Sequence, residues 1–177
     1  MLLDIIFGLI VAILSNFAMG TSESKTAALI FGVFCALAPD IDFIIYILRK
    51  KLKIDQFTHE HRDLFHKPIF FIILGMLLLM LSPELGTIWL IGTIYHLIHD
   101  TFDGGWGIMW LYPFSGKYFT LASYSPQKVF QNKKEQHQIA AKYGDPCWFE
   151  KEIRLSPKLA IKILIAFGII FATVFIL

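Results

Sequence analysis

The chain has 177 residues, of which 56% are hydrophobic, and a formal net charge of +2. Soluble domains contain about 45–50% apolar residues, and the excess here lies in blocks that approach the roughly 20 residues a helix needs to cross a bilayer. The composition therefore excludes an ordinary soluble domain and gives no reason to expect a nucleic-acid partner. Cys35 and Cys147 form neither a disulfide framework nor a CxxC metal motif.

Five apolar blocks predict an all-α bundle of about five membrane spans. The first block follows a start without the basic residues of a signal peptide, so we expect it to be retained as a helix. The second contains Pro39-Asp40-Ile41-Asp42, and Pro39 predicts a broken second helix. In chain order the blocks cover about 2–19, 26–48, 68–81, 87–102 and 159–177.

Lysine and arginine gather in two polar segments, 49–67 and 104–158. Because basic loops stay in the cytoplasm, we expect both segments to be cytoplasmic at a bacterial-type inner membrane, with the N-terminus inside and the C-terminus outside. The expected organisation is a single membrane-embedded domain. It comprises a helical core over 1–114, a long cytoplasmic or interfacial segment over 115–158, and a last transmembrane helix over 159–177.

The long segment has helical signals of its own. Ser125 as N-cap, Pro126 at the first helical position and Gly144 as the stop predict a helix over 126–143. Trp148 and Phe149 predict a short stretch that lies on the membrane surface.

Acids and histidines lie within or beside the apolar blocks. Placing a charged side chain in a bilayer costs free energy, so such residues indicate a functional site. His96, His99 and Asp100 stand at i, i+3 and i+4, so they share one face of the fourth helix. Under the expected topology they meet the acids of the second helix and the histidines of the first polar loop at one depth. Carboxylates and imidazoles together are typical metal ligands. The expected metal site draws on Asp40 and Asp42, on His61 and His66, and on His96, His99 and Asp100.

The two acids of the second helix need a special backbone to act together. On an unbroken helix, Asp40 and Asp42 would point to nearly opposite sides. The break at Pro39 lets both turn toward one cavity, and irregular backbone is tolerated at membrane depth where it lines such a cavity. The simpler alternative is that Asp40 caps the half-helix that follows.

An ordered set of short motifs resembles the YdjM-like family. The motifs are Pro39-Asp40-Ile41-Asp42, His61-Arg62-x-x-x-His66, His96-x-x-x-Asp100, Gly107 and Pro113-Phe114, within about 30–115, with a weaker match at Trp148-Phe149-Glu150. The resemblance implies an inner-membrane, metal-dependent hydrolase. Carried over by position, its metal and catalytic residues would be Asp40, Asp42, His61, His66, His96 and Asp100. Where the family often has Thr-His-Ser, this chain has Phe65-His66-Lys67, so its substrate class can differ.

The first hypothesis is a membrane-bound hydrolase that acts on a lipid or other phosphoester with one or two divalent ions, zinc or manganese. Asp100 would serve as general base, with Asp42 as an alternative. Arg62 would bind a phosphate oxygen, and His99 would carry a proton or support a ligand. The alternatives are a metal or proton transporter and a non-catalytic docking protein that uses the basic helix at 126–143.

Overall fold

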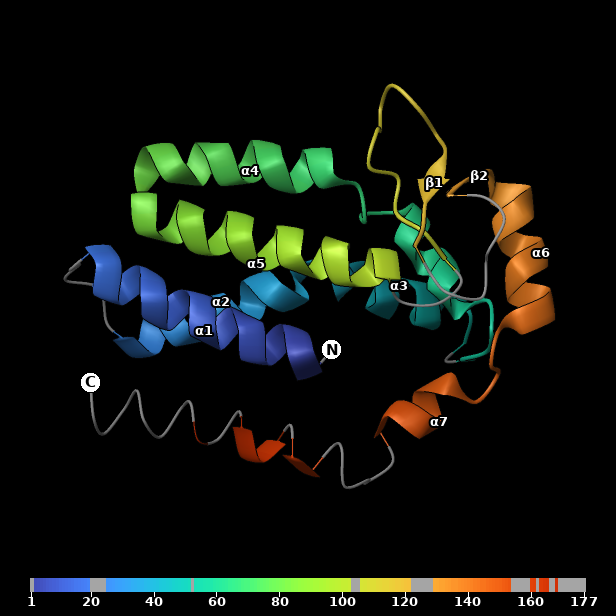
Figure 1. Cartoon of the computed structure of the whole chain (residues 1–177), viewed down its shortest axis with the longest axis horizontal. Helices are drawn as coiled ribbons and strands as arrows, with labels where there is room; N and C mark the ends of the chain where they lie inside the picture. The colour runs from blue at the N-terminus through green and yellow to red at the C-terminus, as the bar shows by residue number, and fades with distance from the viewer. Residues whose placement is uncertain are drawn as a thin grey trace. The chain divides into compact units, whose positions relative to one another are not determined.

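The computed structural model describes residues 2–19, 25–51, 53–102, 106–121, 129–153, 160–161, 163–165 and 168 (Figure 1). The described chain is mainly helical, as predicted. Its elements are α1 (Leu2–Met19), α2 (Lys25–Leu37), the 3-10 turn η1 (Ala38–Asp40), α3 (Ile41–Arg49), the 3-10 segment η2 (Thr58–Asp63), α4 (Pro68–Leu81), α5 (Pro83–Phe102), β1 (Tyr118–Phe119), β2 (Phe130–Gln131), α6 (Lys133–Tyr143) and α7 (Trp148–Ile153).

The chain forms two compact units, each built from segments that are distant in sequence. The first unit contains Met1–Ala38, Phe71–His96 and Arg154–Leu177, and the second contains Pro39–Phe70 and Leu97–Ile153. The chain passes between them inside α4 and α5 and directly after Ala38.

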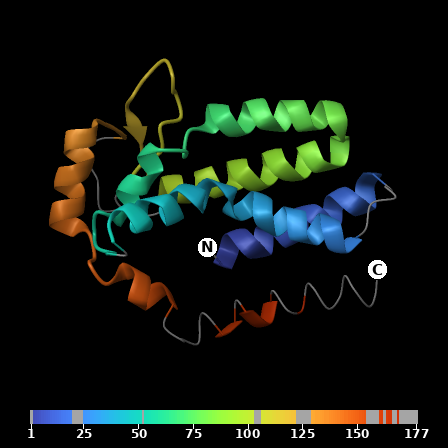
Figure 2. The same cartoon turned by 180° about the vertical axis from the view of Figure 1, so that it is seen from behind.

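In the first unit, α1 and α2 lie side by side (Figure 2) through small residues spaced four apart. A Cβ added to Gly32 would lie 2.8 Å from the Cβ of Ala12, and one added to Gly8 would lie 2.9 Å from the Cβ of Ala36. Only glycine permits this approach of the backbones. The small-xxx-small pattern on both helices is typical of helix pairs in membranes.

The helices α4 and α5 form an antiparallel hairpin around a turn at Ser82 (Figure 1). The indole Nε1 of Trp89 donates to the carbonyl of Phe71 at 2.9 Å and ties the two helices together within the first unit. At the turn, Glu84 is buried and accepts a hydrogen bond from Asn16 on α1 at 3.2 Å. The first unit therefore encloses polar groups as well as apolar ones.

Within the described ranges, two helical stretches are long and apolar enough to cross a membrane, Leu2–Met19 and Lys25–Arg49, and Pro68–Leu81 is a shorter apolar helix. Several of their side chains face outward, including Phe17, which is 80% exposed, and Met80, which is 84% exposed. These features fit a helical membrane protein. The arrangement of five spans stays a prediction, and most of the fifth block, 159–177, lies outside the described residues.

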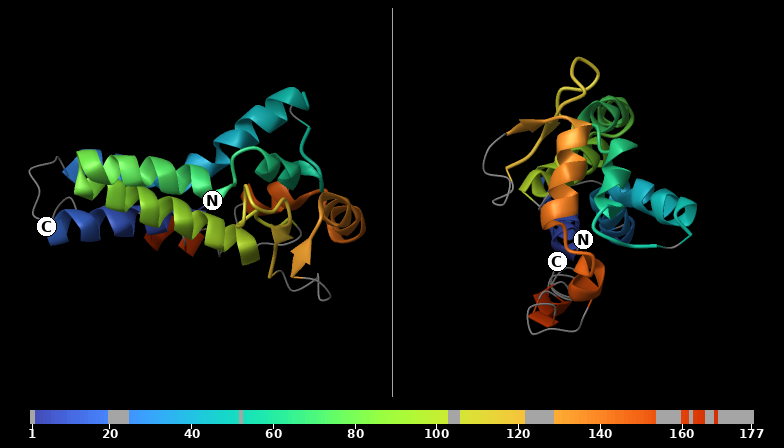
Figure 3. Two further views of the ribbon diagram at one scale, coloured as in Figure 1. Left: turned by 90° about the horizontal axis from the view of Figure 1, so that it is seen from above. Right: turned by 90° about the vertical axis from the view of Figure 1, so that its right-hand side faces the viewer.

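The second unit begins where the long helix breaks. As predicted from Pro39, the α-helical backbone gives way to the 3-10 turn η1 before α3 begins. Further along, β1 pairs with β2 in an antiparallel register, Tyr118 opposite Gln131. The helix α6 stands beside this strand pair (Figure 3), where the side chain of Gln136 accepts a hydrogen bond from the backbone N–H of Gly107 at 2.7 Å.

The helix predicted over 126–143 begins later than expected. Asn132 is its N-cap and forms a capping box with Glu135, so α6 starts at Lys133. The residues before it, Phe130 and Gln131, belong to β2, whose pairing with β1 takes this part of the chain out of the helix. Ser125 and Pro126 lie outside the described residues. The predicted end at Gly144 is confirmed.

Candidate metal centre

Asp40 and Asp42 enter the second unit from the end of η1 and the first turn of α3. Although Asp40 is the N-cap of α3, its side chain makes no capping hydrogen bond with the described backbone of that helix. Asp40 therefore occupies the N-cap position, but the expectation that its side chain caps the half-helix is wrong. The carboxylates of Asp40 and Asp42 instead both approach His61, with Oδ1 of each at 3.7 and 3.8 Å from its Nε2. The broken helix thus turns two acids that are two residues apart toward one point.

His61 is held in one tautomer by the backbone of η2. Its Nδ1 lies 2.7 Å from the carbonyl oxygen of Thr58. A carbonyl only accepts, so Nδ1 carries the proton and donates. The lone pair of the neutral ring is then on Nε2, the atom that faces the two carboxylates. Metal-binding histidines are oriented by the same kind of hydrogen bond from their second nitrogen.

His66 faces carboxylates with both of its ring nitrogens. Its Nδ1 lies 3.0 Å from Oδ2 of Asp42, and its Nε2 lies 3.1 Å from Oδ2 of Asp100 and 3.7 Å from Oδ1 of Asp40. Burial acts to lower the pKa of His66, but the carboxylates of Asp100, Asp40 and Asp42 outweigh it and raise the pKa to about 10. The three carboxylates around His66 therefore favour positive charge on this ring.

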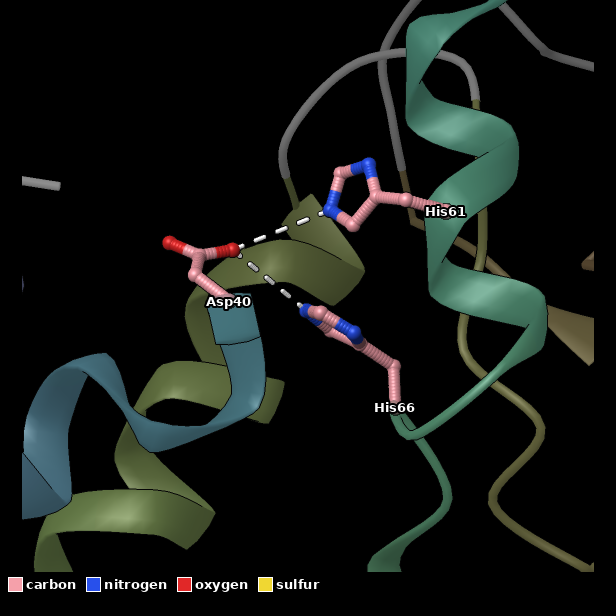
Figure 4. Close-up of side chains that lie close together, drawn as sticks. All are labelled: Asp40, His61 and His66. Carbon is pink, nitrogen blue, oxygen red and sulfur yellow. Dashed lines mark ion pairs between the residues drawn. The ribbon is translucent and has the colours of Figure 1, made fainter. Parts of the chain in front are cut away.

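Asp40, His61 and His66 each direct one ligand atom to a common point. Figure 4 shows the Asp40 carboxylate between the two imidazoles, and the three ligand atoms lie within 4.8 Å of one another. Bonds of about 2.0–2.1 Å around a tetrahedral zinc place its ligands about 3.4 Å apart. The two distances of 3.7 Å from Asp40 Oδ1 to the Nε2 atoms come close to that spacing.

Two buried atoms supply the test of whether a metal fits this site. Among the described residues, none gives a hydrogen-bond partner to His61 Nε2 or to Asp42 Oδ1, although both atoms are buried. A buried acceptor without a donor costs about 1–3 kcal/mol, and more when it is charged. Here a lone pair and a carboxylate oxygen face each other at 3.8 Å. A divalent cation satisfies both, so the donor set fits a metal.

Arg62 fixes the far side of this cluster. Its guanidinium donates to Oδ1 of Asp100 at 2.8 Å and to the carbonyl of Trp106 at 2.8 Å, and the side chain is buried. Since Oδ2 of the same Asp100 faces His66, Arg62 orients Asp100 toward the histidine. This geometry favours a positioning role for Arg62 over the expected contact with a phosphate oxygen.

Asp63 is a structural residue of the site that sequence reasoning missed. Its Oδ1 accepts hydrogen bonds from the Tyr118 hydroxyl at 2.6 Å and from the Trp106 indole at 3.3 Å, and its Oδ2 pairs with Lys133 at 2.6 Å. The bond to Asp63 is the main cause that raises the pKa of Lys133. Asp63 thereby ties η2 to β1 and α6. Its place directly after His61-Arg62 was the only available signal in the sequence.

The remaining predicted residues lie on α5. His96 is buried one turn before Asp100, and its Nδ1 donates to the carbonyl of Ala36 at 2.7 Å. His99 is partly exposed and precedes Asp100 by one residue. Successive helical side chains diverge by about 100°, so His99 and Asp100 lie on either side of His96 on one face of α5. Ligand and proton-carrier roles for these two residues stay predictions.

Solvent reaches the cluster at Asp40. The side chain of Asp40 is 25% exposed, whereas those of Asp42 and His66 are fully buried. An aromatic wall lies beside His61, with the Phe43 ring at 5.3 Å from the imidazole and at 6.3 Å from the ring of Trp148 on α7. A small molecule that approaches the cluster therefore contacts Asp40 first, beside the aromatic wall of Phe43 and Trp148.

The fold and the cluster define a helical membrane protein whose second unit can hold a divalent cation between aspartates and histidines. The chain belongs to the YdjM inner membrane protein family, whose model matches residues 4–175. This match confirms the family expected from the motifs. No curated protein and no solved structure matches the chain.

Proposed function

We propose that the protein is a membrane-bound, metal-dependent hydrolase whose site lies at the cytoplasmic face and acts on a lipid or other phosphoester. One observation carries the proposal. The lone pair of His61 Nε2 and Oδ1 of Asp42 face each other in a buried site, and the part of the chain that the structure describes offers no hydrogen-bond partner to either atom. That arrangement suits a divalent ion, and the mixture of imidazole and carboxylate favours zinc or manganese.

The residues take separate roles in this proposal. Asp40, Asp42, His61 and His66 hold one ion or two, and when bound the ion polarises an ester and activates water. Asp100 or Asp42 takes the proton of the attacking water as general base. Arg62 keeps Asp100 directed toward His66. His96 completes the ligand set from α5, and His99 carries protons at its edge.

The position of the site supports an amphiphilic substrate. The polar loop 49–67, which supplies His61 and His66, is rich in lysine and arginine, and such loops remain in the cytoplasm. The partly exposed Asp40 and the neighbouring Phe43 offer a carboxylate next to an apolar surface. A lipid phosphoester presents a polar head and an apolar chain to match them.

The test is hydrolysis by protein reconstituted in liposomes with added Zn²⁺ or Mn²⁺. A panel of phospholipids and soluble phosphoesters serves as substrates, and released phosphate or headgroup is measured. The account expects activity in the wild type and its loss in Asp40→Asn and His66→Ala. The conservative variant Asp145→Asn, at a side chain of the second unit that is 38% exposed, should retain activity. Full activity in Asp40→Asn or His66→Ala would overturn the proposal.

Transport is the second candidate, because the first unit also contains buried acids. Asp4 on α1 is fully buried and lies 3.9 Å from Nδ1 of His96, and Glu84 is buried beside Asn16. Buried acids in membrane helices are typical of ion and proton pathways. Uptake of zinc or manganese by sealed proteoliposomes, abolished by Asp4→Asn, would favour transport over hydrolysis.

A further inference from the structure

The loop that leads from Trp106 to β1 is a structured finger with an apolar tip. We call residues 109–117 the aromatic finger; it is the yellow loop before β1 in Figure 1. Its base is closed by two backbone hydrogen bonds between Ile108 and Phe119, at 2.9 and 2.8 Å. Gly107 packs so closely there that an added Cβ would lie 2.8 Å from the carbonyl carbon of Phe119. The finger is therefore anchored at its base.

The tip of the finger presents its apolar side chains to the outside. Phe114 is 95% exposed and Leu111 is 54% exposed. Within the finger, the backbone N–H of Ser115 donates to the carbonyl of Leu111 at 3.0 Å, so the two apolar residues belong to one folded turn. This exposed apolar tip is suited to an apolar partner that covers it.

The surroundings of the finger identify that partner. The ring of Tyr112 lies 6.0 Å from the ring of Phe70, the third residue of the apolar helix α4. The Lys67 ammonium lies 4.5 Å from the centroid of Tyr112. Lys117 is exposed at the other end of the finger. Aromatic rings and lysines at the entrance of an apolar helix are typical of the membrane–water interface, where lysines reach the phosphates.

We propose that the aromatic finger inserts into the headgroup–acyl boundary of the bilayer. Phe114 and Leu111 enter the lipid, while Lys67 and Lys117 lie at the level of the lipid phosphates. The occupant is the bilayer itself, because the finger contacts the first turn of α4 through Tyr112 and Phe70. Aromatic rings suit this zone, because an apolar ring can enter the lipid while a polar group on the ring or beside it stays near water.

The finger also connects the membrane surface with the metal-binding cluster. Trp106, just before the finger, accepts a hydrogen bond from Arg62 at its carbonyl oxygen and donates one from its indole N–H to Asp63. Tyr118, just after the finger, donates a hydrogen bond from its hydroxyl to the same Asp63. Insertion of the tip would therefore fix the depth of η2, which carries His61. Membrane contact by the finger does not itself depend on a bound metal or on hydrolysis.

The experiment measures the depth of single labels in a bilayer. In a Cys35→Ala/Cys147→Ser background, nitroxide labels are attached in turn to Phe114→Cys, to Leu111→Cys and to Lys134→Cys on the exposed surface of α6. The full chain is placed in nanodiscs of phosphatidylethanolamine and phosphatidylglycerol. Collision with oxygen, which concentrates in lipid, is compared with collision with a water-soluble nickel chelate.

The account expects labels at 114 and 111 to collide more with oxygen than with nickel, and the label at 134 to show the reverse. The order should be the same with a chelator or with added Zn²⁺, which separates this test from that of hydrolysis. Labels at 114 and 111 that are as open to nickel as the one at 134 would overturn the proposal. Labels shielded from both reagents would overturn it as well, because they would indicate a protein partner.

Discussion

In the first unit, α1 and α2 approach through glycine and alanine, whereas in the second unit charged and hydrogen-bonding side chains fill the space between segments. Gly8 and Gly32 leave no volume for a larger side chain. The imidazoles of His61 and His66, by contrast, are held by directed polar contacts. The comparison teaches that added volume should damage the first unit most, and that small changes in charge or donor geometry should damage the second.

The largest effect is expected from added volume between α1 and α2. Gly32→Leu forces a side chain into the backbone of α1, and overpacking costs about 1–3 kcal/mol or more. We expect a clear drop in the temperature at which the detergent-solubilised protein loses its monodisperse peak. The matched control is Gly116→Leu, because an added Cβ there meets nothing within 4 Å. Equal loss in both variants would contradict the packing argument.

The second unit should be sensitive to donor geometry even when charge is kept. Arg62→Lys preserves the positive charge but loses the fork that reaches Asp100 and the Trp106 carbonyl together. Changes in the outer partners of metal ligands cost about 10–100-fold in affinity. We expect a loss of that size in Zn²⁺ affinity, measured by competition with a chelator. Arg49→Lys, on the exposed end of α3, is the control and should bind as the wild type does.

The pH dependence should have opposite signs with and without metal. The folded protein raises the pKa of His66 from 6.5 to about 10. In chelator, the stabilisation from this group is present below pH 6.5 and is lost as the pH rises toward 10. A metal binds only the deprotonated ring. For each proton that the metal displaces, metal affinity therefore rises about tenfold per pH unit in that range. The unfolding temperature is measured between pH 6.5 and 9, once with chelator and once with Zn²⁺. If it changed with pH in the same way in both series, this would count against metal binding by His66.

The smallest effect is expected from a buried acid of the first unit. Glu84→Gln keeps a hydrogen-bonding side chain beside Asn16 and removes only the charge. We expect metal content to be unchanged and the unfolding temperature to shift little, by the equivalent of about 1 kcal/mol. Metal content is measured by mass spectrometry on the purified variant. If Glu84→Gln emptied the site, the acids of the first unit would be part of the metal pathway and transport would gain weight.

The local signals of the sequence were the most informative. Pro39 predicted the break in the second helix because a proline removes a backbone donor, and Gly144 predicted the end of α6. The start of α6 was wrong because Phe130 and Gln131 pair with β1, which is distant in the chain. No pattern within 126–143 carries information on that pairing.

The candidate site was predictable in its residue types but not in its bonds. The sequence named Asp40, Asp42, His61 and His66 as ligands, and the structure brings them together; that they bind metal stays a prediction. The carbonyl of Thr58 that sets the His61 tautomer is a backbone group, so residue type gives no sign of it. The partners of Arg62 likewise depend on tertiary contacts.

The most direct test of the account is the metal content of the detergent-purified protein by mass spectrometry. Wild type is compared with Asp42→Asn, which removes one charge from the buried cluster, and with Asp145→Asn, where the wild-type side chain is 38% exposed. The account predicts at least one equivalent of zinc or manganese in wild type and Asp145→Asn, and little in Asp42→Asn. A wild type without metal after reconstitution, or full metal in Asp42→Asn, would contradict it.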